Sequence, residues 1–365
     1  MTTMDNQMQD KRPFIRGQIA IESMRDNGFL SAAHALAELI DNSVQAGADC
    51  VDLIAFENRK SSGNGERAVK QIEKIGVFDN GSGMSKEILY LALEFGASKN
   101  RENSSGIGKF GMGLPNSSIS QCRRVDVWSW TDEHEISHTY LDIDLILKGQ
   151  LENIPYPENQ KIPPEVLACL GEKLPKSGTF VLWSKIDRCQ WKTGNSIYRH
   201  TQDIVGRMYR QFLAQDKIAI RFKSAELIEG IYVLGEENRF KANDPLYLLK
   251  DTSLPTLPGN FEGESFFETV DDYEFEVADE FGERQKVRIV GSIVKKAILQ
   301  EIAKTTTKTV GHTDWGKHTL RNVGVSIVRS GRELALREDF LSTDMIQRGV
   351  GRWCGMEISF SPALD

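Results

Sequence analysis

Cysteine is scarce in this chain of 365 residues: there are five cysteines, an odd number, and no two form a Cys-x-x-Cys pair. Neither a disulfide framework nor a zinc ribbon is therefore indicated. The sequence also lacks any apolar run of roughly 18 residues, the length that spans a bilayer. The start of the chain, MTTMDNQMQDKRPF, has no apolar segment long enough for a signal peptide. These absences predict a cytoplasmic protein with no membrane partner.

An excess of positive charge is missing as well. Lysine and arginine total 45 against 52 aspartates and glutamates, which gives a net charge of −7 at pH 7. The chain as a whole is therefore not basic enough to indicate nucleic-acid binding, although a local basic face stays possible. With 40% hydrophobic and 27% charged residues, the composition is that of a soluble globular protein. The length predicts two domains.

The apolar pattern predicts a mixed α+β chain. Residues 31–46 read as a helix, because Ala33, Leu36, Ile40 and Val44 recur on one face. A second helix is expected at 85–96, with Ser85 as its cap. A third helix is expected at 195–215. Strands are expected at 50–56, 74–79, 123–130, 137–145 and 178–187. We place a domain boundary near residue 216, after the third helix, and expect residues 217–365 to form an α+β domain.

A glycine-rich stretch, GIGKFGMGLPNSSIS at 106–120, is typical of a loop whose backbone N–H groups approach a phosphate. It is not a Walker A loop, because Asn103 stands where that motif needs glycine and Phe110 stands where it needs Ser or Thr. It is not a Rossmann fingerprint either, because the preceding ASKNRENSS is no strand. Its meaning depends on two motifs that lie upstream.

The first upstream motif is AELIDNSVQAGA, in which Glu38 and Asn42 are four residues apart. That spacing puts a carboxylate and an amide on one helical face, where together they can hold a water and a metal ion. The second is VFDNGSGM, in which a strand leads Asp79 into a turn with Gly81 and Gly83. Taken alone, Glu38 is a solvated helix carboxylate and Asp79 a turn former.

Together with Thr179, which leads a strand, these motifs resemble the GHKL superfamily, which includes gyrase B, heat-shock chaperones, histidine kinases and MutL. ELIDNSVQAGA is similar to both MutL and the Microrchidia (MORC) ATPases, and the glycine loop is more similar to MORC. Gln45 stands where relatives commonly carry aspartate. The resemblance implies a Bergerat-type α/β sandwich over residues 1–216 that binds ATP and Mg²⁺.

The resemblance also implies a role for each motif. Glu38 would be the general base, and Asn42 would coordinate magnesium. Asp79 would accept the adenine amino group with Thr179 beside it, while Gly83 leaves room for the ring. The glycine loop would be a lid over the phosphates. The residues implied to contact nucleotide are Asp79, Gly81, Gly83, Met84, Ser98, Lys99, Gly106, Gly108, Lys109, Phe110, Gly111, Met112, Gly113 and Thr179.

Residues 217–365 take the position of a transducer domain in this resemblance. VGVSIVRSGREL is similar to its strand-turn-strand, with Gly331 and Arg332 at the turn. Relatives supply a lysine to the γ-phosphate after a strand such as WCGMEISFSP, and this chain ends at Asp365 before such a loop. We therefore expect either a truncated piece or a sensor residue that comes from elsewhere. Lys317 and Arg332 are poor substitutes for that lysine.

The expected function is a slow ATPase in which ATP closes the lid and pairs two copies, with residues 1–20 as a mobile strap across the partner. Three alternatives stay open. They are a nucleotide-gated binding module without hydrolysis, a DNA clamp of MORC or mismatch-repair type, and a chaperone with client proteins.

Overall fold

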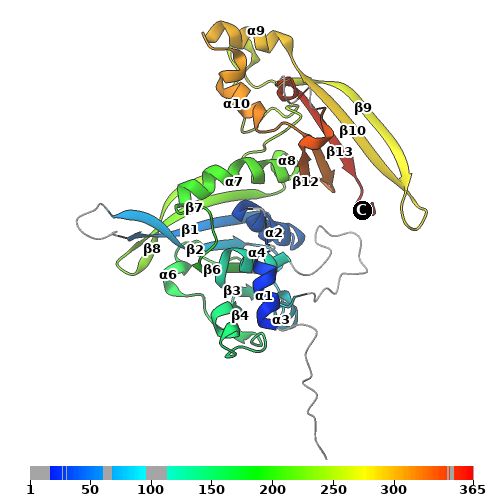
Figure 1. Cartoon of the computed structure of the whole chain (residues 1–365). Helices are drawn as coiled ribbons and strands as arrows, with labels where there is room; N and C mark the ends of the chain where they lie inside the picture. Colours follow the sequence, from blue (N-terminus) through cyan, green and yellow to red (C-terminus); the bar gives the residue numbers. More distant parts are fainter. Residues whose placement is uncertain are drawn as a thin grey trace, which may run out of the picture.

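The computed structural model (Figure 1) describes residues 17–26, 28–29, 31–60, 68–95, 113–342, 345 and 349–364. In this part of the chain one group of strands comprises β1 (Cys50–Lys60), β2 (Val69–Asp79), β3 (Cys122–Trp130), β4 (Ser137–Asp142), β5 (Glu158–Asn159), β6 (Gly178–Ile186), β7 (Ala219–Ile228) and β8 (Ile231–Arg239). They form an eight-stranded sheet in the order β5-β4-β3-β6-β2-β1-β7-β8, called the first sheet below.

The remaining strands form a second sheet. They are β9 (Phe267–Ala278), β10 (Arg284–Val294), β11 (Val325–Arg329), β12 (Arg332–Arg337) and β13 (Cys354–Phe360), and their order is β12-β11-β13-β10-β9. The predicted α+β class is therefore confirmed. Among the described residues, no helix combines the length and the apolar character that crossing a membrane requires.

The helices fall into two groups in Figure 1. Those beside the first sheet are α1 (Gly17–Asp26), α2 (Ala32–Gln45), α3 (Lys86–Ala92), α4 (Gly113–Gln121), α5 (Ile143–Leu147), α6 (Pro164–Leu167), α7 (Gly194–Met208) and α8 (Arg210–Ala214). Those beside the second sheet are α9 (Lys296–Thr305) and α10 (Asp314–Leu320), accompanied by short 3₁₀ turns at Gly259–Phe261, Val310–His312, Glu338–Phe340 and Gly351–Trp353. Helices α7 and α8 lie between the two sheets.

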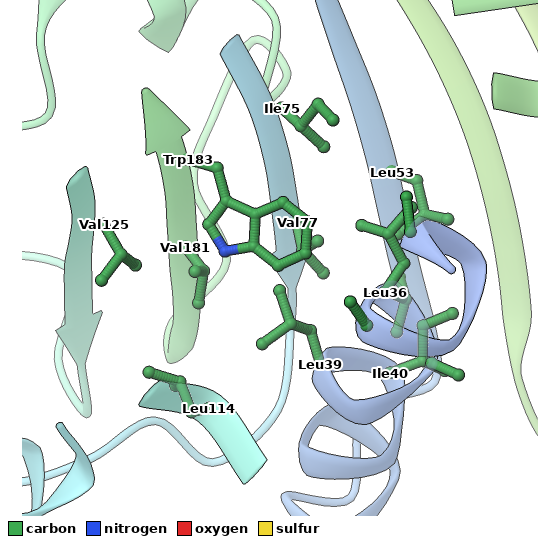
Figure 2. Packing of buried hydrophobic residues seen from close by; sticks show 14 of the residues in the cluster. Leu36, Leu39, Ile40, Leu53, Ile75, Val77, Leu114, Val125, Val181 and Trp183 are labelled. Carbon is green, nitrogen blue, oxygen red and sulfur yellow. The ribbon is translucent and has the colours of Figure 1, made fainter. Parts of the chain in front are cut away.

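Helix α2 follows the predicted 3.6-residue period. Leu36, Leu39 and Ile40 are fully or almost fully buried, and Figure 2 shows them facing Leu53 and Val77 of the sheet. Burying each such side chain contributes about 1.5–3 kcal/mol. The opposite face of α2 is thus free to present polar side chains. Ser85 caps α3 as predicted, because its side chain accepts a hydrogen bond from the backbone N–H of Ile88.

The register of the first sheet places three polar residues in one row. Asp79 at the end of β2 pairs with Thr179 at the start of β6, and Thr179 pairs in turn with Ser129 of β3. Directly paired residues lie on the same face of a sheet. The row therefore brings together the side chains of Asp79, Ser129 and Thr179, which are separated by 50 to 100 positions in the sequence.

The first sheet extends beyond residue 216, where the domain boundary is predicted. Strand β7 pairs with β1 in parallel, Cys50 opposite Ala219, and β8 pairs with β7, so the sheet extends to Arg239. Asp216, with φ of 50°, marks only a turn between α8 and β7. A parallel partner lies far away in the sequence, so local patterns do not reveal it.

Two further predictions need adjustment. The helix expected at 195–215 is α7 followed by α8, with Tyr209 between them at φ −108° and ψ 15°. The strand expected at 137–145 ends at Asp142, whose carboxylate caps α5 by accepting from the backbone N–H groups of Asp144 and Leu145. The strap expected at 1–20 stays a prediction. Residues 17–20 belong to α1, and residues 1–16 lie outside the described residues.

Candidate functional site

Asp79 lies at the end of β2 and is only 6% exposed. Its carboxylate accepts hydrogen bonds from the Ser43 hydroxyl of α2, at 3.0 Å, and from the backbone N–H of Gly81, at 2.9 Å. Burial raises the pKa of Asp79, while hydrogen bonds from Gly81, Ser43 and Thr179 partly oppose that rise. The bond to Gly81 also closes the turn, so Asp79 is a turn former whose carboxylate is in addition tied to α2.

Gly83 adopts φ of +69°, and a Cβ at this position would lie 1.9 Å from the backbone oxygen of Trp130. At Gly81 a Cβ would lie 2.7 Å from that of Ala46. The turn is therefore pressed between the end of α2 and β3. The space on the Cβ side of Gly83 is filled by the Trp130 backbone, so packing within the protein already requires a glycine here. The expected room for a ligand ring stays a prediction.

Ser129 connects Thr179 to the turn. Its hydroxyl donates to the carbonyl of Gly178 at 3.1 Å and accepts from the backbone N–H of Met84 at 2.9 Å. The Thr179 hydroxyl lies 3.0 Å away. Either hydroxyl can be the donor in this pair. Sequence reasoning missed Ser129, whose only signal is its strand register.

Glu38 and Asn42 occupy successive turns of α2, and both are half-buried. A Cβ on Gly113 would lie 2.8 Å from Oε2 of Glu38, so this carboxylate lies against the first residue of α4. Burial raises the pKa of Glu38 and the charge of Asp41 raises it further, whereas Arg332 lowers it. Glu38 is thus neither fully solvated nor in an ordinary electrostatic environment.

The structure therefore groups the predicted site residues at two adjoining places. Asp79, Gly81, Gly83, Met84 and Thr179 meet at the ends of β2 and β6, and Glu38 meets Gly113 at the start of α4. Helix α2 serves both places. The other predicted loop residues lie outside the described residues, and their contacts stay predictions: Ser98, Lys99, Gly106, Gly108, Lys109, Phe110, Gly111 and Met112.

One buried cluster beside α2 was not foreseen. Asp41 forms a two-pronged ion pair with Arg332 of β12, with Nη2 to Oδ2 at 2.7 Å and Nε to Oδ1 at 3.2 Å. Tyr209 donates its hydroxyl to the same carboxylate at 2.7 Å. Sequence reasoning placed Arg332 at a turn between two strands and considered it a weak replacement for a lysine. No local pattern links it to Asp41, which lies 291 positions earlier.

Comparison with known proteins finds a family that part of the chain resembles. Residues 30–171 match the family described as histidine kinase-, DNA gyrase B- and HSP90-like ATPases. The matched segment is less than half of the chain, and it is similar to GHKL ATPases.

Two individual proteins are similar to parts of the chain. The human (Homo sapiens) MORC family CW-type zinc finger protein 1 is 33% identical over 119 residues, which are 31% of this chain and 11% of that protein. The match thus spans about a tenth of the relative's length. A crystal structure described as the N-terminal domain of a DNA repair protein has a TM-score of 0.48 and 14% identity, covering 94% of this chain and 87% of that chain.

Proposed function

We propose that this chain binds Mg²⁺–ATP at the end of β2 and hydrolyses it slowly, as a nucleotide-dependent switch. The observation that carries the proposal is Asp79, an almost fully buried carboxylate whose position is fixed by Ser43 of α2 and by Gly81. A buried carboxylate with perturbed ionisation beside a glycine turn is suited to recognise a base amino group. Thr179 offers its hydroxyl from the neighbouring strand.

In this proposal Glu38 orients and deprotonates the attacking water. Its raised pKa makes it a stronger base than a solvated glutamate. Its place against the first residue of α4 directs it toward the end of a helix, where anionic phosphates bind favourably. Lys109 and the glycines of the loop are proposed to contact the phosphates there.

Asn42 is proposed to hold the magnesium ion, which would neutralise phosphate charge when bound. Among the described residues there is no group of three or more His, Cys, Asp or Glu side chains that would hold a metal by themselves. An amide oxygen suits a hexacoordinate cation that keeps waters and phosphate oxygens as its other ligands.

The experiment that tests the activity is Glu38→Gln, which keeps the shape of the side chain and removes the base. We expect ATP to bind as in the wild type, and turnover to fall about 10²- to 10⁴-fold, the usual contribution of a general base. Glu22→Gln, an exposed position on α1, is the matched control. Unchanged turnover in Glu38→Gln would remove Glu38 from this role, and absence of ATP binding by the wild type would refute the proposal.

We propose further that ATP binding pairs two copies of the chain, because closed twofold pairing is the commonest oligomer. Light scattering with a non-hydrolysable ATP analogue tests this step, and a doubled mass only with nucleotide is the expected result. A monomer at all concentrations, with the analogue bound, would contradict pairing and leave ATP binding intact.

A further inference from the structure

A side chain of the second sheet, Arg332, reaches the helix that carries Glu38 and Asn42. Arg332 is the first residue of β12 and directly follows the turn of Ser330 and Gly331, which have φ of 51° and 81°. A Cβ on Gly331 would lie 3.1 Å from Gln211 of α8, so the turn lies against that helix. Arg332 itself is 7% exposed and extends to α2.

The contact on α2 is specific in geometry. Arg332 presents two N–H groups to the two oxygens of Asp41, and its Nη1 donates to the backbone oxygen of Glu333 at 2.8 Å. A planar guanidinium paired in this way fixes orientation as well as distance. Asp41 directly precedes Asn42 and lies three residues after Glu38, so all three side chains belong to one five-residue stretch of α2.

The same strand is anchored on its other face. Glu333 pairs with Arg207 of α7 and with the almost fully buried Arg210 of α8, the latter at 3.1 Å. Arg210 also pairs with Glu357 of β13. One ionic cluster therefore holds the second sheet to α7 and α8. Through its ion pair with Asp41, Arg332 connects the same sheet to α2.

Stability alone is a poor reason for such a pair. Burying two charges costs solvation that their attraction often fails to recover, and well-packed apolar replacements are frequently as stable. The positive charge also acts on the proposed base, since Arg332 lowers the pKa of Glu38 and opposes the effect of Asp41. The residue is thus arranged to affect the chemistry on α2.

We propose that Arg332 is a positioning residue for ATP hydrolysis: by gripping Asp41 it fixes the turn of α2 that presents Glu38 and Asn42, and makes turnover depend on the placement of the second sheet. This inference rests on the proposed function. It assigns Arg332 no contact with substrate, so ATP binding, which depends mainly on Asp79 and Thr179, is expected to survive its loss.

The test compares Arg332→Gln and Arg332→Lys with the control Arg321→Gln. Arg321 is half-exposed and forms an ion pair with Asp203 of α7 at 2.9 Å. It follows α10 beside the second sheet, so this ion pair also reaches a helix of the first sheet, but that helix is α7 and not α2. We expect turnover by Arg332→Gln to fall about 10- to 100-fold, as a small misplacement of catalytic groups produces. ATP affinity, measured with a fluorescent analogue, should change less than about threefold, the signature of a lost positioning interaction. Lysine should restore part of the turnover, and the control should match the wild type.

Removing Arg332 alone leaves Asp41 buried without its ion-pair partner, so a second variant, Asp41→Asn with Arg332→Met, removes the grip together with the buried charge. Full turnover in that folded double variant would overturn the inference. So would a loss of turnover and ATP affinity by the same factor, which a general defect in folding produces. If the wild type neither binds nor hydrolyses ATP, the proposed function fails too. If the wild type binds and hydrolyses ATP and the Arg332 variants do so equally well, only the role of Arg332 is overturned.

Discussion

Replacing Gly83 with alanine perturbs the turn that fixes Asp79. The added Cβ would lie 1.9 Å from the oxygen and 2.7 Å from the carbonyl carbon of Trp130, and 3.2 Å from the oxygen of Gly178. All three atoms belong to the backbone of the first sheet, so no rotamer change relieves the contact. The turn or the strand must move instead.

The magnitude follows from two costs. An L-residue in the left-handed region costs about 1–2 kcal/mol, and forcing a methyl group into a packed interior typically costs about 1–3 kcal/mol more. We therefore expect Gly83→Ala to lower the free energy of unfolding by about 2–5 kcal/mol. Gly47 provides the matched control, because its φ is +70° and a Cβ there would meet nothing within 4 Å. Gly47→Ala should lose only the backbone part, about 1–2 kcal/mol.

Urea unfolding of both variants measures this difference, and binding of an ATP analogue to the folded protein shows whether the turn has moved. Gly83→Ala should be the less stable variant by at least about 1 kcal/mol and should bind the analogue more weakly. Equal stabilities of the two variants would show that the contact with Trp130 is absent in solution and would refute the packing explanation of Gly83.

Two further predictions concern buried ionisable groups. Asp79→Asn removes a buried charge, so the free energy of unfolding should stay the same or rise. The affinity for ATP should fall about 10- to 100-fold, which is the contribution of a charged hydrogen bond. Calorimetric titration measures this affinity, and an unchanged value would contradict the proposed recognition of the base by Asp79. His318 hydrogen-bonds Tyr247 and Ser253, and burial lowers its pKa from 6.5 to about 4. Unfolding exposes His318, which can then bind a proton. The contribution of neutral His318 to the free energy of unfolding is therefore present above pH 6.5 and is lost as the pH falls toward 4, by up to about 3 kcal/mol. His318→Gln should flatten this part of the curve of stability against pH, and an unchanged slope would contradict the lowered pKa.

The parts of the site that the sequence predicts are those encoded locally. The period of α2 follows from residues within four positions of one another, and the strand leading to Asp79 ends at a turn whose residues are contiguous. Ser129, the pairing of β1 with β7 and the grip of Arg332 on Asp41 depend on register and packing between distant segments. An arginine after a glycine carries no signal of the carboxylate it will meet, so these features needed the structure.

The alternation of side chains along β12 has a consequence for how its hairpin with β11 forms. A slip of one residue exchanges the two faces of a strand. Glu333 would then be turned toward Asp41, and Arg332 toward Arg207 and Arg210, so that both ionic contacts would become repulsive together. Mispairing of this hairpin is thus penalised at two helices simultaneously, and the correct alignment is selected by charge as well as by the Ser330–Gly331 turn.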